Sequence, residues 1–486
     1  MDSNSLKRKA FSGFAWKFAE RISAQLVSTI VSIVLARLLM PEDYAVVGIV
    51  AIFFAFCNIF VSGGLNTALI QKKDADLEDY STILYTNLIL ATILYVVMFF
   101  AAPFIAKIYE KEILVPVIRV MGLNFFVNGV KAILSAYTSS KLQFKKFFFA
   151  TISGTVISAI VGIIMAVNGF GAWALVAQQM TNSLIGTITL LFTTKFKLLL
   201  KFSFSKLKSL FAYGWNILSA SFISVLYDEL NPLIVGLKYS SADLSFYTKG
   251  KHFPGLINST VSSTLSSVLF PVMSKVQDNK DAVLNITRKY IKVSSFIIFP
   301  VMIGFFAVSE NFVVVLLTEK WLGAVPYLQI FSLTYMFDII QIGNLQAIKA
   351  IGRSDITLKL EVIKKSAYFM IIILFLMNTN SPEGLAASAI VCTCVATIVN
   401  TYPNRKLIGY SYRLQLLDIL PNLLIAVIMG VCVISMGQLN LSPFLLLILQ
   451  IATGAILYVV LSIITRNSNF TYMLNILKQF IRRTEK

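Results

Sequence analysis

Long apolar segments separated by short polar breaks are the dominant pattern along this chain. Fourteen of these segments approach the roughly 20 mostly apolar residues that a helix needs to cross a bilayer. The alternation predicts an all-α, polytopic membrane protein rather than a string of soluble domains. The predicted spans are centred near residues 24, 54, 92, 125, 158, 181, 222, 261, 299, 337, 368, 393, 427 and 453.

The composition agrees with a membrane protein. The 486 residues are 57% hydrophobic and 13% charged, whereas soluble domains carry about 25% charged residues. The net charge of +19 would suggest nucleic acid if the protein were soluble. Here the basic residues lie mostly between apolar segments, so no nucleic-acid partner is expected. The four cysteines lie inside apolar segments without metal or redox spacing, so no cofactor is expected either.

The distribution of positive charge predicts the orientation in the membrane. With the N-terminus in the cytoplasm, 31 of the 42 Lys and Arg residues fall in cytoplasmic segments, 7 in outer segments and 4 within spans. Cytoplasmic loops of membrane proteins carry such an excess of Lys and Arg. Fourteen spans with both termini in the cytoplasm therefore fit the sequence, and no cleavable signal peptide is expected.

An internal repeat appears at an offset near 200 residues. The run from Val34 to Ala45 aligns with the run from Ile234 to Ser245, which pairs Asp43 with Asp243. A six-span repeat predicts two parallel halves with a substrate path between them, and chance likeness between apolar helices is the alternative. The predicted parts are an N-terminal half (1–194), a basic cytoplasmic linker with five lysines (195–208), a C-terminal half (209–408), two further spans (409–466) and a basic amphipathic cytoplasmic tail (467–486).

Ionisable side chains inside the spans mark candidate site residues, because charge at membrane depth is costly. In the first span, Lys17, Arg21 and Gln25 lie four residues apart and share one stripe of the helix. Glu20 lies to one side, where it can pair with Lys17. Lys and Arg bind phosphate groups, so the stripe suits an anionic head group, and the alternative is that the cations extend to lipid head groups. Lys131, deep in the fourth span, is a further candidate for lining a cavity.

Later spans carry candidates of both signs. Asp228 in the seventh span and Asp338 in the tenth are candidates for binding a coupling cation, and an interfacial position is the alternative for Asp228. His252, the only histidine, and its neighbour Lys251 predict an anion-attracting entrance at the outer end of the eighth span. A hydrated histidine at the interface is the alternative there.

Several phrases of the sequence resemble a known family. SGFAWKFAERISAQLVSTIVSIVLARLLMPEDY, GLNTALIQKKD and LFPVMSKVQD resemble Wzx-type polysaccharide flippases of the multidrug/oligosaccharidyl-lipid/polysaccharide superfamily, near the colanic acid exporters. The likeness covers nearly the whole chain and departs from the family at Ala45, where glycine is usual. These phrases indicate the fold and leave the transported glycan open.

The resemblance implies a transporter that flips undecaprenyl-pyrophosphate-linked oligosaccharide units across the bacterial inner membrane by alternating access. The product would be O-antigen of lipopolysaccharide, capsule or exopolysaccharide. The resemblance also implies that basic residues of the first span bind the substrate. A polysaccharide polymerase and a chain-length regulator are candidate partners.

Two alternatives belong to other classes of function. A MATE-like, cation-coupled exporter of small molecules is disfavoured, because such cavities favour acidic groups and the first span carries basic ones. A membrane polysaccharide polymerase or ligase is disfavoured by short outer loops and by the lack of a nucleophile–base pair or metal-ligand cluster in the sequence. We therefore predict a transporter and not an enzyme.

Overall fold

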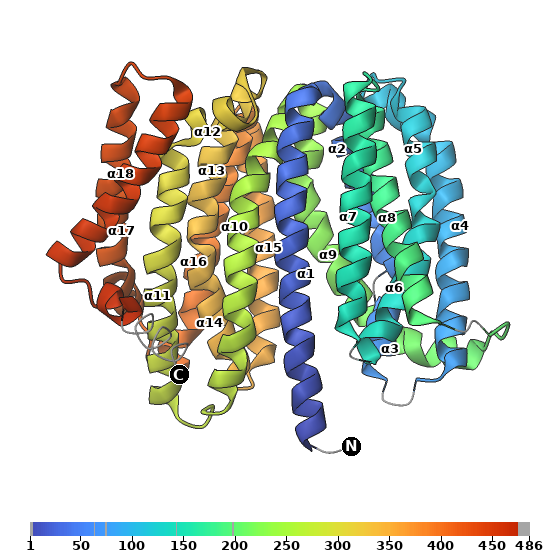
Figure 1. Ribbon diagram of the computed structural model, residues 1–486. Coiled ribbons are helices and arrows are strands. Elements are labelled where there is room, and N and C mark those ends of the chain that lie inside the picture. The colour runs from blue at the N-terminus through green and yellow to red at the C-terminus, as the bar shows by residue number, and fades with distance from the viewer. Residues whose placement is uncertain (1–2, 63, 73–74, 142, 197–198, 475–486) are drawn as a thin grey trace. The chain divides into compact units, whose positions relative to one another are not determined.

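The computed structural model describes residues 3–62, 64–72, 75–141, 143–196 and 199–474, and the regular elements in these ranges are all helical (Figure 1). This confirms the predicted all-α class. Some side chains, including that of Lys17, and residues 475–486 of the predicted tail lie outside the description. The helices are α1 (Ser3–Leu38), α2 (Pro41–Ser62), α3 (Gly64–Gln71), α4 (Leu77–Ile108), α5 (Leu114–Gly122), α6 (Asn124–Ser140), α7 (Phe144–Val167), α8 (Ala172–Thr194), α9 (Phe204–Lys238), α10 (Ser241–Ser274), α11 (Lys280–Ala307), α12 (Ser309–Leu316), α13 (Val325–Met336), α14 (Asp338–Ala350), α15 (Ser354–Asn378), α16 (Pro382–Leu407), α17 (Tyr412–Ser435) and α18 (Pro443–Ile464), with 3-10 turns at Glu319–Ala324 and Met436–Gln438.

Ten helical segments of the described chain are long and apolar enough to cross a membrane. The protein is therefore a multi-pass membrane protein, as predicted. The remaining predicted spans coincide with α8, α10, α13–α14 and α15, which are helical but are not among these ten segments. The total of fourteen is consistent with the helices and stays a prediction.

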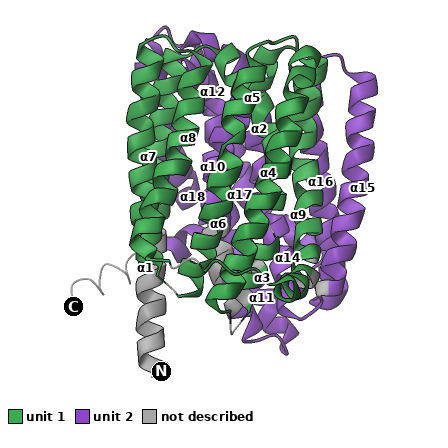
Figure 2. Cartoon of the chain, turned by 90° about the vertical axis from the view of Figure 1, so that its right-hand side faces the viewer, with its two compact units in different colours: residues 1–245 green, residues 246–486 purple. Residues whose placement is uncertain are grey.

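The chain divides into two compact units, residues 1–245 and 246–486 (Figure 2). The seventh span, α9, belongs to unit 1 because it packs along α2 and against α3. Phe222 of α9 lies near Phe56 and Phe60 of α2, with ring centroids 5.9 and 6.1 Å apart. The linker predicted between the halves comes one helix before this division. The predicted halves are defined by the sequence repeat, whereas the two units are defined by compact packing. The units therefore do not test the halves, which stay a prediction.

Helices α3 and α9 approach to backbone distance where Gly64 faces Gly214. A Cβ added to Gly64 would lie 1.9 Å from the carbonyl oxygen of Gly214. Small residues let transmembrane helices pack closely, because lipid provides no hydrophobic force to drive helices together. Glycine at both positions therefore permits this close crossing within unit 1.

The two turns that the repeat aligns have similar local structure. Two residues separate α1 from α2, and two residues separate α9 from α10. Asp43 accepts a hydrogen bond from the backbone N–H of Met40, and Asp243 accepts one from that of Ser240, each at 3.0 Å. Both carboxylates thus satisfy a donor that the start of a helix leaves unpaired. This similarity supports the aligned turns, while the repeat as a whole stays a prediction.

A buried ion cluster joins α17 to α11 in unit 2. Asp418, whose side chain is 2% exposed, accepts two hydrogen bonds of 2.8 Å from Arg288. The Nζ of Lys292 lies 3.1 Å from the same carboxylate, and the Tyr410 hydroxyl donates to it at 2.9 Å. The cluster therefore fastens α17 to α11, and α18 in turn packs on α17. Both C-terminal spans are thus held to the rest of unit 2.

Candidate functional site

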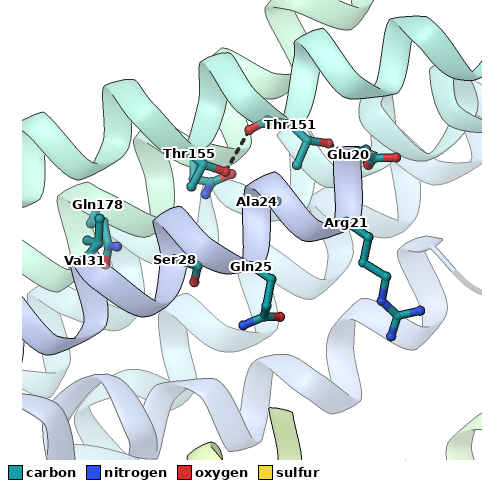
Figure 3. Close-up of a pocket in the computed structure, with 10 residues that line it drawn as sticks. Glu20, Arg21, Ala24, Gln25, Ser28, Val31, Thr151, Thr155 and Gln178 are labelled. Atoms are coloured by element: carbon teal, nitrogen blue, oxygen red, sulfur yellow. Dashed lines mark hydrogen bonds between the residues drawn. The ribbon is translucent and has the colours of Figure 1, made fainter. Parts of the chain in front are cut away.

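A polar cavity of about 510 Å³ lies among α1, α7 and α8 of unit 1 (Figure 3). Each helix contributes a pair of polar side chains four residues apart, a spacing that places both on one face of the helix. In a bilayer such a wall requires water or a polar ligand, because lipid cannot satisfy its hydrogen-bonding groups. The pairs are Arg21 and Gln25 from α1, Thr151 and Thr155 from α7, and Gln178 and Asn182 from α8.

Close packing of α7 on α8 positions the two amide side chains of the cavity. A Cβ on Gly154 would lie 2.9 Å from the backbone oxygen of Asn182, and a Cβ on Gly162 would lie 3.0 Å from the Cβ of Gln178. Larger residues at either glycine would push α8 away from α7. The small residues of α7 therefore hold the two amides against α7, with Gln178 at the Val31 end of the cavity (Figure 3).

The neighbouring residues Glu20 and Arg21 point to different sides of α1 (Figure 3). Glu20 is 8% exposed and accepts a hydrogen bond of 2.8 Å from the Thr151 hydroxyl. Its carboxylate also attracts the ammonium group of Lys131 on α6. Arg21 is exposed on the side of α1 that carries Gln25. The helix thus directs its negative charge toward α7 and presents its positive charge to the open side of the cavity.

A second polar cavity, of about 460 Å³, lies among α2, α3 and α6 of the same unit and contains Lys131. The amide of Asn128 donates to the side-chain oxygen of Asn58 at 3.0 Å, and the Ser183 hydroxyl of α8 donates to Asn128 at 3.3 Å. One ammonium group thus stands among carboxamides and hydroxyls, groups that both donate and accept hydrogen bonds. The other polar residues of this wall are Asn66, Ser135 and Ser139.

The structure places the predicted residues of unit 1 as follows. Arg21 and Gln25 line the first cavity and Lys131 lines the second, while the side chain of Lys17 lies outside the described residues. Asp228 on α9 is exposed, and the Ser224 hydroxyl donates to its carboxylate at 3.5 Å. The first span's polar stripe therefore does border a cavity, at least from Arg21 onward.

The remaining predicted residues lie in unit 2. Asp338 accepts a hydrogen bond of 2.8 Å from the amide of Asn258 and one of 3.3 Å from that of Gln341. Amides from α10 and α14 thus surround this carboxylate. The Nε2 of His252 is buried and has no hydrogen-bond partner within the described part of the chain, and its neighbour Lys251 is half-buried. None of these residues lines the two cavities of unit 1.

Sequence analysis missed the contributions of α7 and α8 to the first cavity. Thr151, Thr155, Gln178 and Asn182 carry no charge, so the cost of placing charge in a membrane does not single them out. The signal that would find them is the four-residue spacing of polar side chains on otherwise apolar helices. The asparagines of the second cavity carry no comparable signal, because Asn58 and Asn128 come from different helices.

Comparisons with known proteins agree with these observations. A family model described as "Polysaccharide biosynthesis protein" matches residues 34–326, more than half of the chain. The chain is 22% identical to the teichuronic acid biosynthesis protein TuaB of Bacillus subtilis, over 94% of this chain and 96% of that protein. It is 23% identical to the lipopolysaccharide biosynthesis protein WzxC of Escherichia coli, over 90% of each. It is 20% identical to the succinoglycan biosynthesis transport protein ExoT of Rhizobium meliloti, over 90% of this chain and 89% of that protein.

Solved structures show the same fold. The lipid II flippase MurJ in an inward closed conformation matches with a TM-score of 0.76 and 16% identity, over 93% of this chain and 99% of that one. An inward-facing MATE family transporter matches with a TM-score of 0.65 and 15% identity, over 79% of this chain and 94% of that one. The resemblance stated from the sequence phrases is thus confirmed, and these structures support the fold alone.

Proposed function

Because this chain belongs to the polysaccharide biosynthesis protein family, we propose that it is a transporter that flips a lipid-linked oligosaccharide across the bacterial inner membrane. The oligosaccharide is carried on undecaprenyl pyrophosphate and supplies O-antigen, capsule or exopolysaccharide. The observation that carries the proposal is the polar cavity of unit 1, where an exposed arginine stands among amides and hydroxyls at membrane depth. A transporter needs such a cavity to shield a hydrophilic head group from lipid.

In this proposal the pyrophosphate binds the basic stripe of α1. Arg21 supplies a planar guanidinium that donates paired hydrogen bonds to phosphate oxygens. Gln25 lies one turn further along the same face (Figure 3), and Lys17 lies one turn before Arg21 in the sequence. The Glu20 carboxylate points toward α7, where it accepts a hydrogen bond from Thr151. The side of α1 that faces the phosphate therefore carries only the positive charge of Arg21 among these two residues.

The glycan passes through the polar interior while the lipid tail stays in the bilayer. The second cavity, with Lys131 among carboxamides and hydroxyls, offers donors and acceptors for sugar hydroxyls. On the outer side, the ammonium group of Lys251 attracts the anionic head group as it leaves. The imidazole of His252, which the sequence predicts as its partner in this role, is buried and uncharged beside Lys249, so we do not assign it an attraction for the head group. Alternating access arises from movement between the two halves that the repeat predicts.

Both chain termini lie in the cytoplasm in this proposal, and fourteen spans cross the membrane. Asp228 and Asp338 are the two carboxylates that we assign to cation coupling. The amide groups bonded to Asp338 are neutral, and the nearby Lys364, which also acts on this carboxylate, is paired with Glu361 at 2.6 Å. A bound cation or a proton would therefore neutralise Asp338. The released glycan passes to a polysaccharide polymerase and a chain-length regulator.

The test is complementation of the host's deletion strain, which should accumulate lipid-linked units inside the cell. The wild-type chain should restore surface polysaccharide, and Arg21→Gln should not. Hydrogen bonds to charged groups contribute about 1.5–3 kcal/mol, so Arg21→Gln should weaken substrate binding about ten- to a hundredfold. Arg21→Lys keeps the positive charge but lacks the planar guanidinium that donates paired hydrogen bonds, so it should restore part of the activity.

Protein amount in the membrane fraction provides the control for every variant. Failure of the wild-type chain to clear the accumulated units would contradict the transport function itself. Full activity of Arg21→Gln at normal protein amount would leave transport standing and remove Arg21 from the substrate site.

A further inference from the structure

The loop between α8 and α9 exposes large apolar side chains outside the body of any transmembrane helix. Leu200 is 89% exposed and Phe202 is 48% exposed, and both lie in irregular backbone. Phe204, the first residue of α9, is 72% exposed. Such side chains are stable in contact with lipid and costly in contact with water. This part of the loop therefore lies against the bilayer.

Side chains of α4 bond the backbone at the two ends of the same loop. The N–H of Leu199 donates to the Ser81 hydroxyl at 3.0 Å, and the Tyr85 hydroxyl donates to the Leu199 carbonyl at 3.3 Å. The N–H of Ser203 donates to the Thr82 hydroxyl at 3.1 Å. Irregular backbone is tolerated at membrane depth only where protein groups satisfy its polar atoms. Three hydroxyls of α4 meet that requirement at Leu199 and Ser203. The loop therefore lies at the membrane surface, where water reaches the backbone between these two residues while the apolar side chains contact lipid.

A groove of about 460 Å³ lies between this loop and α4. Its wall from α4 is formed by Tyr85 and Ile89, which lie roughly 12 and 18 Å along the helix from its first residue at the helical rise. Its wall from the loop is formed by Leu200 and Phe202. The one charged residue of the wall is Lys201, which is exposed.

Two lysines of the linker, Lys206 and Lys201, differ in their contacts. Lys206 donates to Asp76 at 2.6 Å and to Glu78 at 2.8 Å, and its hydrogen bond lowers the pKa of Asp76 to about 2. That lysine fixes the linker to the start of α4. Lys201 makes no such ion pair among the described residues, and it stands at the edge of an apolar groove.

We propose that this groove binds one chain of an anionic phospholipid from the adjoining leaflet, with its phosphate beside Lys201. Apolar walls with one ammonium group at the edge match a lipid that carries a single phosphate. None of the groove residues lines either polar cavity of unit 1. We therefore assign the groove to bulk phospholipid rather than to the transported lipid, and the assignment does not depend on the proposed transport function.

The test uses the full chain in nanodiscs of phosphatidylcholine mixed with phosphatidylglycerol, followed by native mass spectrometry of retained lipid. The wild-type chain should retain phosphatidylglycerol. Lys201→Gln should reduce its retention about fivefold, the effect of one lysine near an anionic lipid. Lys208→Gln removes an exposed linker charge that does not line the groove, so it is the matched control and should change nothing.

A second pair of variants tests the apolar wall. Phe202→Ser should reduce retention of both lipids, whereas Phe104→Ser, which changes a 67% exposed residue of α4 outside the groove, should not. Equal losses in Lys201→Gln and Lys208→Gln would overturn the proposal, because the charge effect would then be diffuse. Displacement of phosphatidylglycerol by an equal amount of undecaprenyl phosphate would also overturn it and assign the groove to the carrier lipid.

Discussion

One methyl group added at Gly64 should force α3 and α9 apart. Its Cβ would lie 1.9 Å from the carbonyl oxygen of Gly214, whereas real Cβ contacts essentially never fall below 3.0 Å. The two helices must therefore separate by roughly 1.1 Å along that direction. The obstructing atom belongs to the backbone, so no side chain can rotate away to relieve the contact. Overpacking of this kind costs about 1–3 kcal/mol.

Two other glycines give a graded series with Gly64→Ala. At Gly214 the nearest atom to an added Cβ is 3.0 Å away, and alanine inside a helix is favoured over glycine by about 1 kcal/mol. Gly214→Ala should therefore be close to neutral. Gly48 on α2 is the control, because its added Cβ would lie 3.8 Å from Leu244, an ordinary contact.

The assay is thermal unfolding of each purified variant in the same detergent, with surface polysaccharide of the complemented host as a second measurement. Gly64→Ala should melt at the lowest temperature, followed by Gly214→Ala, with Gly48→Ala at or above the wild type. A wild-type melting temperature for Gly64→Ala would refute the reasoning, since α3 and α9 could not then be in backbone contact. Greater damage from Gly214→Ala would refute the geometry of the crossing.

Two further variants test ion pairs of opposite burial. Asp418→Asn should lower the free energy of unfolding by about 1.5–3 kcal/mol, the contribution of hydrogen bonds to a charged group, because Arg288 stays partly hydrated when the carboxylate is lost. An unchanged melting temperature would contradict this. Lys206→Gln should leave the melting temperature nearly unchanged, because its pairs are at the surface, but it should speed hydrogen exchange in residues 199–203. Since the pKa of Asp76 is lowered to about 2, this pairing is fully present above the ordinary carboxylate pKa and is lost only as the pH falls toward 2. Wild-type exchange between pH 5 and 7, corrected for intrinsic rates, should therefore show constant protection, and protection that changes in that window would contradict it.

Most of the fold could be predicted from apolar segment length. A chain in lipid must satisfy its backbone hydrogen bonds internally, so each apolar segment becomes a helix. The sequence repeat also paired Asp43 with Asp243, and both residues accept a hydrogen bond from the backbone N–H three residues earlier; this capping role was not predicted. The close crossing at Gly64 was not, because its partner Gly214 lies on a distant segment and glycines are common in membrane helices.

The candidate site was predicted in part. Spacing along α1 placed Arg21 and Gln25 on one face, and both line the cavity. A helical wheel fixes relative angles but not the neighbouring helix, so the hydrogen bond from Thr151 to Glu20 had no counterpart in the sequence. The same limit hid Asp418, a single acidic residue in an apolar span whose basic partner comes from another helix.

The ion cluster of unit 2 also sets an order for biosynthesis. Arg288 precedes Asp418 by 130 residues, so at roughly 5–20 residues per second the ribosome makes the carboxylate about 6 to 26 s after the guanidinium. During that interval α11 carries the charges of Arg288 and Lys292 without the group that neutralises them in the finished protein. A nascent chain that stops before α17 would keep this cationic pair without its counter-charge, whereas in a complete chain Asp418 pairs with both side chains. Neutralisation of α11 therefore waits until α17 has been made.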